Sequence, residues 1–274
     1  MSVPPEMAGQ PPQGAAAGEP LIVQRHEGWV HVRFNRPEAL NAWDVATARA
    51  FLGVVESLAN DDGVRAVLLS GAGRAFMAGG DLAQLRAAPV ETAHALIGPL
   101  HQALRRLTSM RAPVVAALHG AVAGAGLSLA LAADVAIDAA GTRFNLAYTR
   151  IGTSCDLGAT WSLPRMVGLR RALQIALLSE DFDADRAEAW GLVARVVPAE
   201  RLVEEAQALT RRLAQGPTRA YGHIKRLMRT SSGQPLDRQL DDEQSAFADC
   251  AAGEDFAEGL DAFFDKRAPR FVGR

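Results

Sequence analysis

The sequence has few cysteines, little net charge and no long apolar run. Of its 274 residues, Cys155 and Cys250 are the two cysteines. They lie far apart and without metal-ligand spacing, which indicates a reducing compartment and no disulfide framework. No apolar run approaches the ~18 residues of a membrane-spanning helix, and no secretory signal pattern opens the chain. The net charge of −2 favours neither nucleic acid nor membrane as a partner. We therefore expect a cytoplasmic protein.

The motifs that mark nucleotide and metal cofactors are also absent. In the two glycine-rich segments, Phe76 and Leu129 stand where a dinucleotide fingerprint has its third glycine. No phosphate-binding Lys-Ser/Thr pair follows either segment. The six histidines are scattered without ligand spacing. We therefore expect neither a metal nor a separate cofactor.

The order of apolar patterns predicts an α/β protein. Residues 1–20 are rich in Pro, Gly, Ala and Gln, which predicts a disordered tail. Asp44 precedes apolar residues at helical spacing and so predicts a capped helix. The other predicted elements are a hairpin over 21–34, strands over 64–70, 113–118 and 134–139, a helix over 91–110, and mainly helices after 158. This alternation predicts a core over residues 21–200 and a helical C-terminal region over 201–274.

The most informative stretch runs from His119 to Asp134. The apolar run just before it predicts a buried strand, residues 120–126 a glycine-rich loop, and residues 127–133 a buried helix. Small residues let a ligand approach the backbone, and the first N–H groups of a helix attract negative charge. A second glycine-rich loop, residues 71–81, also follows a predicted strand. Amides converging from two such loops would form an oxyanion hole, although the glycines are equally compatible with close helix–strand packing.

Several motifs occur in the order found in one enzyme superfamily. Residues 74–82 resemble the first oxyanion loop of the crotonase (enoyl-CoA hydratase/isomerase) superfamily, and residues 113–134 resemble its second. Residues 35–42, 164–168, 187–193 and 258–267 also follow its pattern, so that the resemblance covers about residues 20–274. It implies a crotonase-like spiral of ββα units with a helical C-terminal trimerisation region. It also implies a homotrimer or a dimer of trimers.

The same resemblance implies an acyl-CoA thioester substrate, with coenzyme A carried as part of the substrate. The N–H groups of Ala78 and Ala125 match the two oxyanion donors, although Ala125 stands where many relatives have glycine. Lys266 matches a lysine that reaches the coenzyme A phosphates in relatives. The other residues expected to line the substrate site are Ala75, Gly80, Asp81, Leu82, Gly124, Ser128, Tyr148 and Phe263. Asp81 and Asp134 are also interpreted as structural caps or turn residues.

The catalytic side chains depart from the hydratases of the superfamily. Those enzymes carry two glutamates, at positions that read Ser128 and Tyr148 here. A carboxylate occurs nearby at Asp156, and the segment around it resembles isomerases that move a proton with an aspartate, including the phenylacetate-pathway subgroup. The physical alternative for Asp156 is the N-cap of a helix beginning just after it. Tyr148 is interpreted either as a hydrogen-bond donor or as part of the pocket wall.

Three functions are consistent with these residues. The first is an enoyl-CoA isomerase in which Asp156 is the acid and base, and Ala78 and Ala125 bind the thioester oxygen. The second is an enoyl-CoA hydratase, which needs a further partner for Asp156. The third is a homologue that binds coenzyme A thioesters without catalysis. The acyl group and the pathway stay open.

Overall fold

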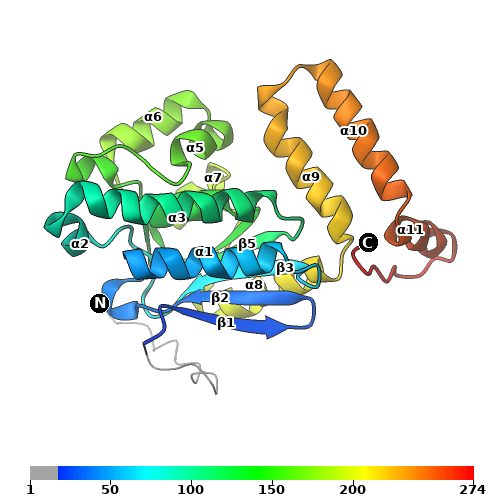
Figure 1. Cartoon of the computed structure of the whole chain (residues 1–274), viewed down its shortest axis with the longest axis horizontal. Coiled ribbons are helices and arrows are strands. Elements are labelled where there is room, and N and C mark those ends of the chain that lie inside the picture. The colour runs from blue at the N-terminus through cyan, green and yellow to red at the C-terminus, as the bar shows by residue number, and fades with distance from the viewer. Residues whose placement is uncertain (1–17) are drawn as a thin grey trace.

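The computed structural model describes residues 18–274 and contains two β-sheets enclosed by helices (Figure 1). The larger sheet has six strands in the order β1-β2-β3-β5-β7-β10, and the smaller has four in the order β4-β6-β8-β9. The strands of the larger sheet are Leu21–His26, Trp29–Phe34, Ala66–Gly71, Val114–Leu118, Val135–Ala139 and Arg195–Val197. Those of the smaller sheet are Ala75–Met77, Ala121–Ala123, Arg143–Asn145 and Phe182–Asp183. The predicted disordered tail falls on residues 1–20, of which 1–17 lie outside the described residues.

The larger sheet is parallel except for its first hairpin, β1–β2. The central strands β3 and β5 are buried on both faces, which agrees with their mainly apolar sequences. Alternate residues of each strand point to opposite faces. Thus Val67 and Val114 pack toward α1 and α3, whereas Leu68 and Val115 pack toward α8. Figure 1 shows α1 and α3 lying across one face of this sheet.

The two sheets are connected by a repeated ββα unit. Each of β3, β5 and β7 runs into a short strand of the smaller sheet, namely β4, β6 and β8, and then into helical segments. This repeat confirms the crotonase-like spiral. It also corrects the expectation of two plain glycine-rich loops, because each contains a short strand.

Eleven α-helices are assigned within residues 18–274. They are α1 Val45–Ala59, α2 Leu82–Ala87, α3 Pro89–Ser109, α4 Ala125–Ala132, α5 Ala159–Val167, α6 Leu169–Leu178, α7 Ala184–Ala189, α8 Leu202–Ala214, α9 Thr218–Thr230, α10 Leu236–Ala251 and α11 Glu254–Phe264. Asp44 caps α1 by accepting a hydrogen bond from the Thr47 amide, as predicted. Among the described residues, no helix is long and apolar enough to cross a membrane.

The helical C-terminal region has two parts. Helix α8 packs on the larger sheet, whereas α9, α10 and α11 form an arm that projects from the body (Figure 1). Asp134 fastens this arm, because its carboxylate pairs with Lys225 at 2.7 Å and Arg229 at 2.9 Å. It also accepts a hydrogen bond from the Val114 amide at 2.8 Å. The aspartate interpreted as a cap or turn residue therefore joins the arm to the sheet.

Candidate active site

The two glycine-rich segments meet at Gly79 and Gly124. A Cβ atom added to Gly124 would lie 3.5 Å from the Cα of Gly79, and one added to Gly79 would lie 3.9 Å from the Ala125 nitrogen. Gly124 has φ of 51° and ψ of −125°, a conformation that residues with a side chain rarely adopt. The segments that carry Ala78 and Ala125 are therefore in direct contact.

The amide of Ala125 is free to bind a ligand. Ala125 is the first residue of α4, so its N–H has no acceptor within the helix. Among residues 18–274, no other acceptor binds this N–H. The partial positive charge of the helix N-terminus adds to the attraction for an anionic oxygen. This geometry suits an oxyanion donor.

The amide of Ala78 is already engaged. It donates a hydrogen bond to the carbonyl oxygen of Leu40 at 3.1 Å. Leu40 and the next residue, Asn41, have φ of 51° and 57°, in the left-handed region that non-glycine residues adopt with strain. Binding of a ligand by this amide therefore requires either a shared hydrogen bond or movement of Leu40.

Asn41 fastens the segment that leads to Ala78. The side chain is 1% exposed, and its Nδ2 donates to the carbonyl oxygens of Ala72 at 2.9 Å and Ala75 at 2.8 Å. Its Oδ1 accepts from the Arg36 amide at 2.9 Å. The motif that contains Asn41 supported the resemblance, but its sequence gave no signal of this long-range role. The carbonyl of Ala75, a predicted substrate residue, is thus occupied by the protein itself.

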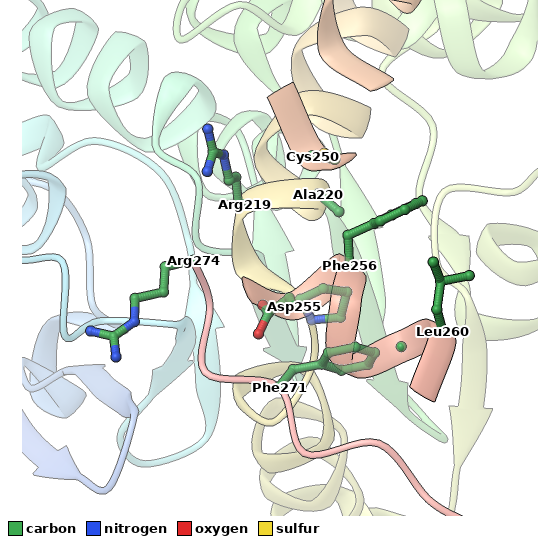
Figure 2. Close-up of a pocket in the computed structure, with 10 residues that line it drawn as sticks. Arg219, Ala220, Cys250, Asp255, Phe256, Leu260, Phe271 and Arg274 are labelled. Atoms are coloured by element: carbon green, nitrogen blue, oxygen red, sulfur yellow. The ribbon is translucent and has the colours of Figure 1, made fainter. Parts of the chain in front are cut away.

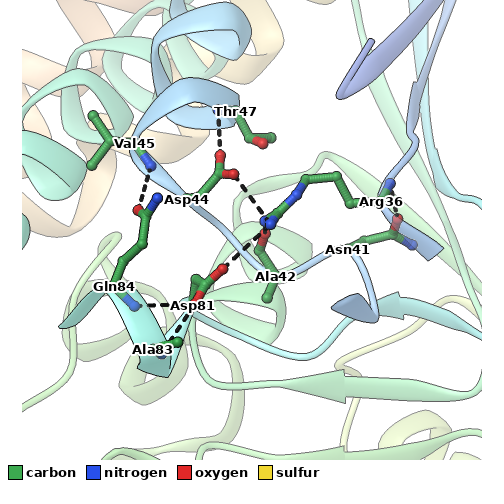
Figure 3. A network of polar contacts seen from close by, with 9 residues as sticks. All are labelled: Arg36, Asn41, Ala42, Asp44, Val45, Thr47, Asp81, Ala83 and Gln84. Carbon is green, nitrogen blue, oxygen red and sulfur yellow. Dashed lines mark hydrogen bonds and ion pairs between the residues drawn. The ribbon is translucent and has the colours of Figure 1, made fainter. Parts of the chain in front are cut away.

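A second polar network holds the other end of this segment (Figure 3). Asp81 caps α2, as predicted, by accepting hydrogen bonds from the amides of Ala83 and Gln84. Arg36 pairs with Asp81 at 3.3 Å and with Asp44 at 3.2 Å. The carboxylates that begin α1 and α2 are therefore joined through one guanidinium. This arrangement fixes the start of α2, where the predicted residues Gly80 and Leu82 flank Asp81.

Ser128, Tyr148 and Asp156 form one hydrogen-bonded chain. Ser128 lies in α4 and is fully buried, and Tyr148 begins a short 3-10 helix, Tyr148–Ile151, and is 8% exposed. The Ser128 Oγ and the Tyr148 hydroxyl are 2.9 Å apart, and the same hydroxyl donates to Oδ1 of Asp156. Ser128 also donates to the carbonyl of Gly124 at 3.3 Å. Continuous contacts therefore connect Asp156 to the meeting point of the two loops.

Burial dominates the acid–base properties of this chain. Burial raises the pKa of Asp156, while the Tyr148 hydrogen bond and nearby His101 partly offset this rise. Burial and the neighbouring carboxylate together raise the pKa of Tyr148 far above its usual value, so its hydroxyl stays protonated. A buried aspartate with a raised pKa beside a fixed hydrogen-bond donor is typical of a general acid or base.

The alternative interpretation of Asp156 as a helix cap is wrong. Gly158, not Asp156, is the N-cap of α5, and no side chain caps this helix. The Asp156 carboxylate points instead to Tyr148, and only its main-chain oxygen bonds the first helical amide, that of Ala159. His101 was not predicted from the sequence, yet its Nε2 accepts a hydrogen bond from the Leu157 amide at 3.2 Å. The Asp156 carboxylate is therefore not engaged by the end of α5 and is available to act as an acid or base.

Phe263 and Lys266 do not join this site within one chain. Phe263 belongs to α11 and is 75% exposed, and Lys266 follows the same helix. Figure 1 places α11 and α2 at opposite ends of the long axis, and α2 directly follows the Ala78 segment. The expectation that both line the site is therefore not met by the chain alone.

The arm has an apolar pocket of its own. It has a volume of about 250 Å³ and lies between α9, the end of α10, α11 and the C-terminal tail (Figure 2). Phe256, Leu260 and Phe271 supply apolar walls. Asp255 holds the tail in place by accepting from the amides of Val272 at 2.6 Å and Gly273 at 2.8 Å. None of its lining residues belongs to the two loops or to the Asp156 chain.

The sequence is similar to those of a known enzyme family. The profile of the enoyl-CoA hydratase/isomerase family matches residues 24–274. The chain belongs to this family. It is 37% identical over 261 residues to 1,2-epoxyphenylacetyl-CoA isomerase of Escherichia coli, covering 93% of this chain and 98% of the relative. It is also 37% identical over 248 residues to a probable enoyl-CoA hydratase of Rhodobacter capsulatus, covering 90% and 96%.

Solved structures of family members confirm the fold. An enoyl-CoA hydratase structure from Streptomyces coelicolor is 35% identical, covers 98% of this chain and 100% of its own, and has a TM-score of 0.89. An enoyl-CoA hydratase/isomerase structure from Mycobacterium abscessus is 37% identical, covers 93% and 100%, and has a TM-score of 0.87. The predicted family, its fold and its enzymatic nature are thus confirmed, whereas the roles of individual residues remain predictions.

Proposed function

We propose that this protein is an enoyl-CoA isomerase that uses Asp156 as its single acid and base. The observation that carries this proposal is the Asp156 carboxylate, held by Tyr148 rather than by a helix end. Contacts through Ser128 and Gly124 connect it to the amide of Ala125. The substrate is an acyl-CoA thioester, and no separate cofactor takes part.

The proposed reaction moves one proton along the acyl chain. The amides of Ala78 and Ala125 bind the thioester oxygen, and Asp156 removes a proton from C2 of a 3-enoyl-CoA. The resulting dienolate is stabilised by the two donors, each contributing roughly 3 kcal/mol in the transition state. Protonated Asp156 then returns the proton at C4, which gives the conjugated 2-enoyl-CoA and restores the carboxylate.

Hydration is the second candidate, and the similarity to a probable enoyl-CoA hydratase favours it. That reaction needs one group to activate water and another to protonate the α-carbon. The two positions that carry glutamates in such enzymes are Ser128 and Tyr148, which bond to each other here. Among the described residues, no second carboxylate belongs to the hydrogen-bonded chain of Ser128, Tyr148 and Asp156. The site therefore supports isomerisation better.

The arm supports a homo-oligomer, for which we propose a homotrimer or a dimer of trimers. Its three helices expose apolar side chains to solvent in the single chain: Ile224, Met228, Leu236, Leu240, Phe247, Leu260, Phe263 and Phe264. Such a surface is typical of a protein interface. In an oligomer, Phe263 and Lys266 would reach the substrate bound to another protomer. Light scattering coupled to size-exclusion chromatography measures the assembly directly.

We also propose a cytoplasmic location.

Proton NMR of purified protein with trans-3-hexenoyl-CoA tests the reaction. We expect formation of 2-hexenoyl-CoA, with hydroxyacyl-CoA as a minor product at most. Asp156→Asn should lower kcat/KM by about 10²- to 10⁴-fold while acyl-CoA binding by calorimetry persists. Asp61→Asn is the matched control, because Asp61 lies on the surface and pairs only with Arg25 among ionised side chains of the described chain. Predominant hydration would favour the hydratase, and unchanged turnover in Asp156→Asn would refute its catalytic role.

A further inference from the structure

We propose that Tyr148 is the positioning residue of the active site: its hydroxyl holds Oδ1 of Asp156, so that Oδ2 alone exchanges protons with the substrate. The proposal rests on the isomerase function proposed above. It gives the two oxygens of the Asp156 carboxylate different roles. Tyr148 acts through Asp156 and does not itself donate a proton to the substrate.

The two oxygens of the Asp156 carboxylate differ in their surroundings. Oδ1 accepts the hydrogen bond from Tyr148. Among the described residues, no side chain bonds Oδ2, and Oδ2 is not sealed from solvent as an unpaired buried atom. A carboxylate held at one oxygen keeps a fixed plane, and its second oxygen keeps a defined direction. A proton shuttle between two carbons of one substrate needs that defined direction.

The direction of each hydrogen bond follows from the donors available. Ionised Asp156 can only accept, so the single hydrogen of the Tyr148 hydroxyl points to Oδ1. The hydrogen of Ser128 is then free to go to the Tyr148 oxygen or to the Gly124 carbonyl. A hydrogen bond received from Ser128 polarises the tyrosine hydroxyl and strengthens its bond to the carboxylate. Ser128 and Tyr148 therefore stabilise the charged form of Asp156 together.

Hydrogen bonds on both sides of Tyr148 hold the backbone that carries its side chain. Tyr148 is the buried residue of its 3-10 helix, whereas Thr149, Arg150 and Ile151 are exposed. The turn before it is held by Asn145, whose Oδ1 accepts from the Ala147 amide at 2.6 Å. Arg150 fastens the outer side by donating to the Ser179 carbonyl at 2.8 Å. The hydroxyl is thus placed by contacts on both sides of the residue.

The charged and titratable groups around Asp156 come from three segments. Tyr148 faces it from the 3-10 helix, His101 from α3, and Cys155 precedes it in the chain. Of these, only Tyr148 donates to the carboxylate. Removal of its hydroxyl should therefore raise the pKa of Asp156 further, because burial would no longer be offset by this bond.

The test is the pH dependence of kcat/KM for trans-3-hexenoyl-CoA in Tyr148→Phe. Ionised Asp156 starts the reaction, so kcat/KM rises with pH through the pKa of this group in the free enzyme. In Tyr148→Phe we expect the rising limb of the pH profile of kcat/KM to shift to higher pH by about 1 unit. We also expect the plateau value of kcat/KM to fall by about 10- to 100-fold. Ser128→Ala should move the limb in the same direction by less. Tyr221→Phe removes the other tyrosine hydroxyl, on α9, and should leave the limb unchanged.

Two results would overturn the proposal. One is a Tyr148→Phe enzyme of wild-type activity, and the other is a lowered plateau with an unmoved limb, which indicates a structural role alone. If the wild type does not isomerise the substrate, the proposed function fails, and infrared difference spectroscopy decides the inference separately. The carboxyl titration that Asp156→Asn abolishes should then shift to higher pH in Tyr148→Phe, and an unshifted titration would refute the positioning role.

Discussion

The contact between α4 and β4 sets the distance between the two proposed oxyanion amides, and Gly126 makes this contact possible. A Cβ atom added to Gly126 would lie 2.2 Å from the Met77 carbonyl oxygen and 2.8 Å from the Met77 Cβ. An ordinary contact needs about 3.5 Å, so Gly126→Ala must move α4 and β4 apart by about 1 Å. Ala125 directly precedes Gly126, and Ala78 directly follows Met77, so both amides move with them. A displacement of this size costs about 10²-fold in rate.

We therefore expect Gly126→Ala to lower kcat/KM for trans-3-hexenoyl-CoA by about 100-fold, or about 2.7 kcal/mol of transition-state stabilisation. Overpacking should also lower the free energy of unfolding by about 1–3 kcal/mol. Gly53→Ala is the matched control, since a Cβ there meets nothing within 4 Å and the site is an exposed interior position of α1. It should stabilise the protein by up to about 1 kcal/mol at unchanged kcat/KM. A folded Gly126→Ala enzyme with wild-type kcat/KM would show that this contact does not set the oxyanion geometry.

Three further substitutions test how the site and the arm are held. Asn41→Ala removes the amide that donates to the carbonyl oxygens of Ala72, Ala75 and Phe76, and should cost about 1–3 kcal/mol in urea unfolding; an unchanged midpoint would contradict this. Asp134→Asn deprives Lys225, whose side chain is 9% exposed, of its carboxylate, and should cost about 3 kcal/mol and speed proteolysis of the arm. Asp138 is fully buried, and this burial raises the pKa of its carboxyl group to about 7. Between about pH 4 and pH 7 the carboxyl group of Asp138 is protonated in the folded state but ionised in the unfolded state. The free energy of unfolding should therefore fall as the pH rises through this range. Asp138→Asn should flatten that dependence in thermal melts, and an unaltered slope would contradict the assignment.

The longer elements could be predicted from the sequence because their signals are local. Helix α1 repeats apolar residues every three or four positions after a capping aspartate, and α3 does the same over 21 residues. Strand β5 is a continuous run of five apolar residues, and β3 begins with four apolar residues. The family motifs added the order of the loops and the position of Asp156.

The smaller sheet could not be predicted in this way. Its strands have two or three residues, too few to show an alternating pattern, and two of them lie within the glycine-rich segments. Three of them, β4, β6 and β8, directly follow strands of the larger sheet and pair in parallel with one another. The fourth, β9, follows α6 and pairs antiparallel with β8. This sheet brings the Ala78 and Ala125 segments together.

The sequence by itself determined the family and the main helices and strands, and it supplied the candidates for the oxyanion and acid–base residues. The tertiary structure alone decided that the Asp156 carboxylate bonds to Tyr148 instead of capping α5, and that the Leu40 carbonyl occupies the Ala78 amide. The physical reason is range: helical periodicity and capping act within a few residues, whereas these hydrogen bonds join separate, irregular segments. Their partners are chosen by how α4, the 3-10 helix and the loop before α1 pack, which no local pattern encodes.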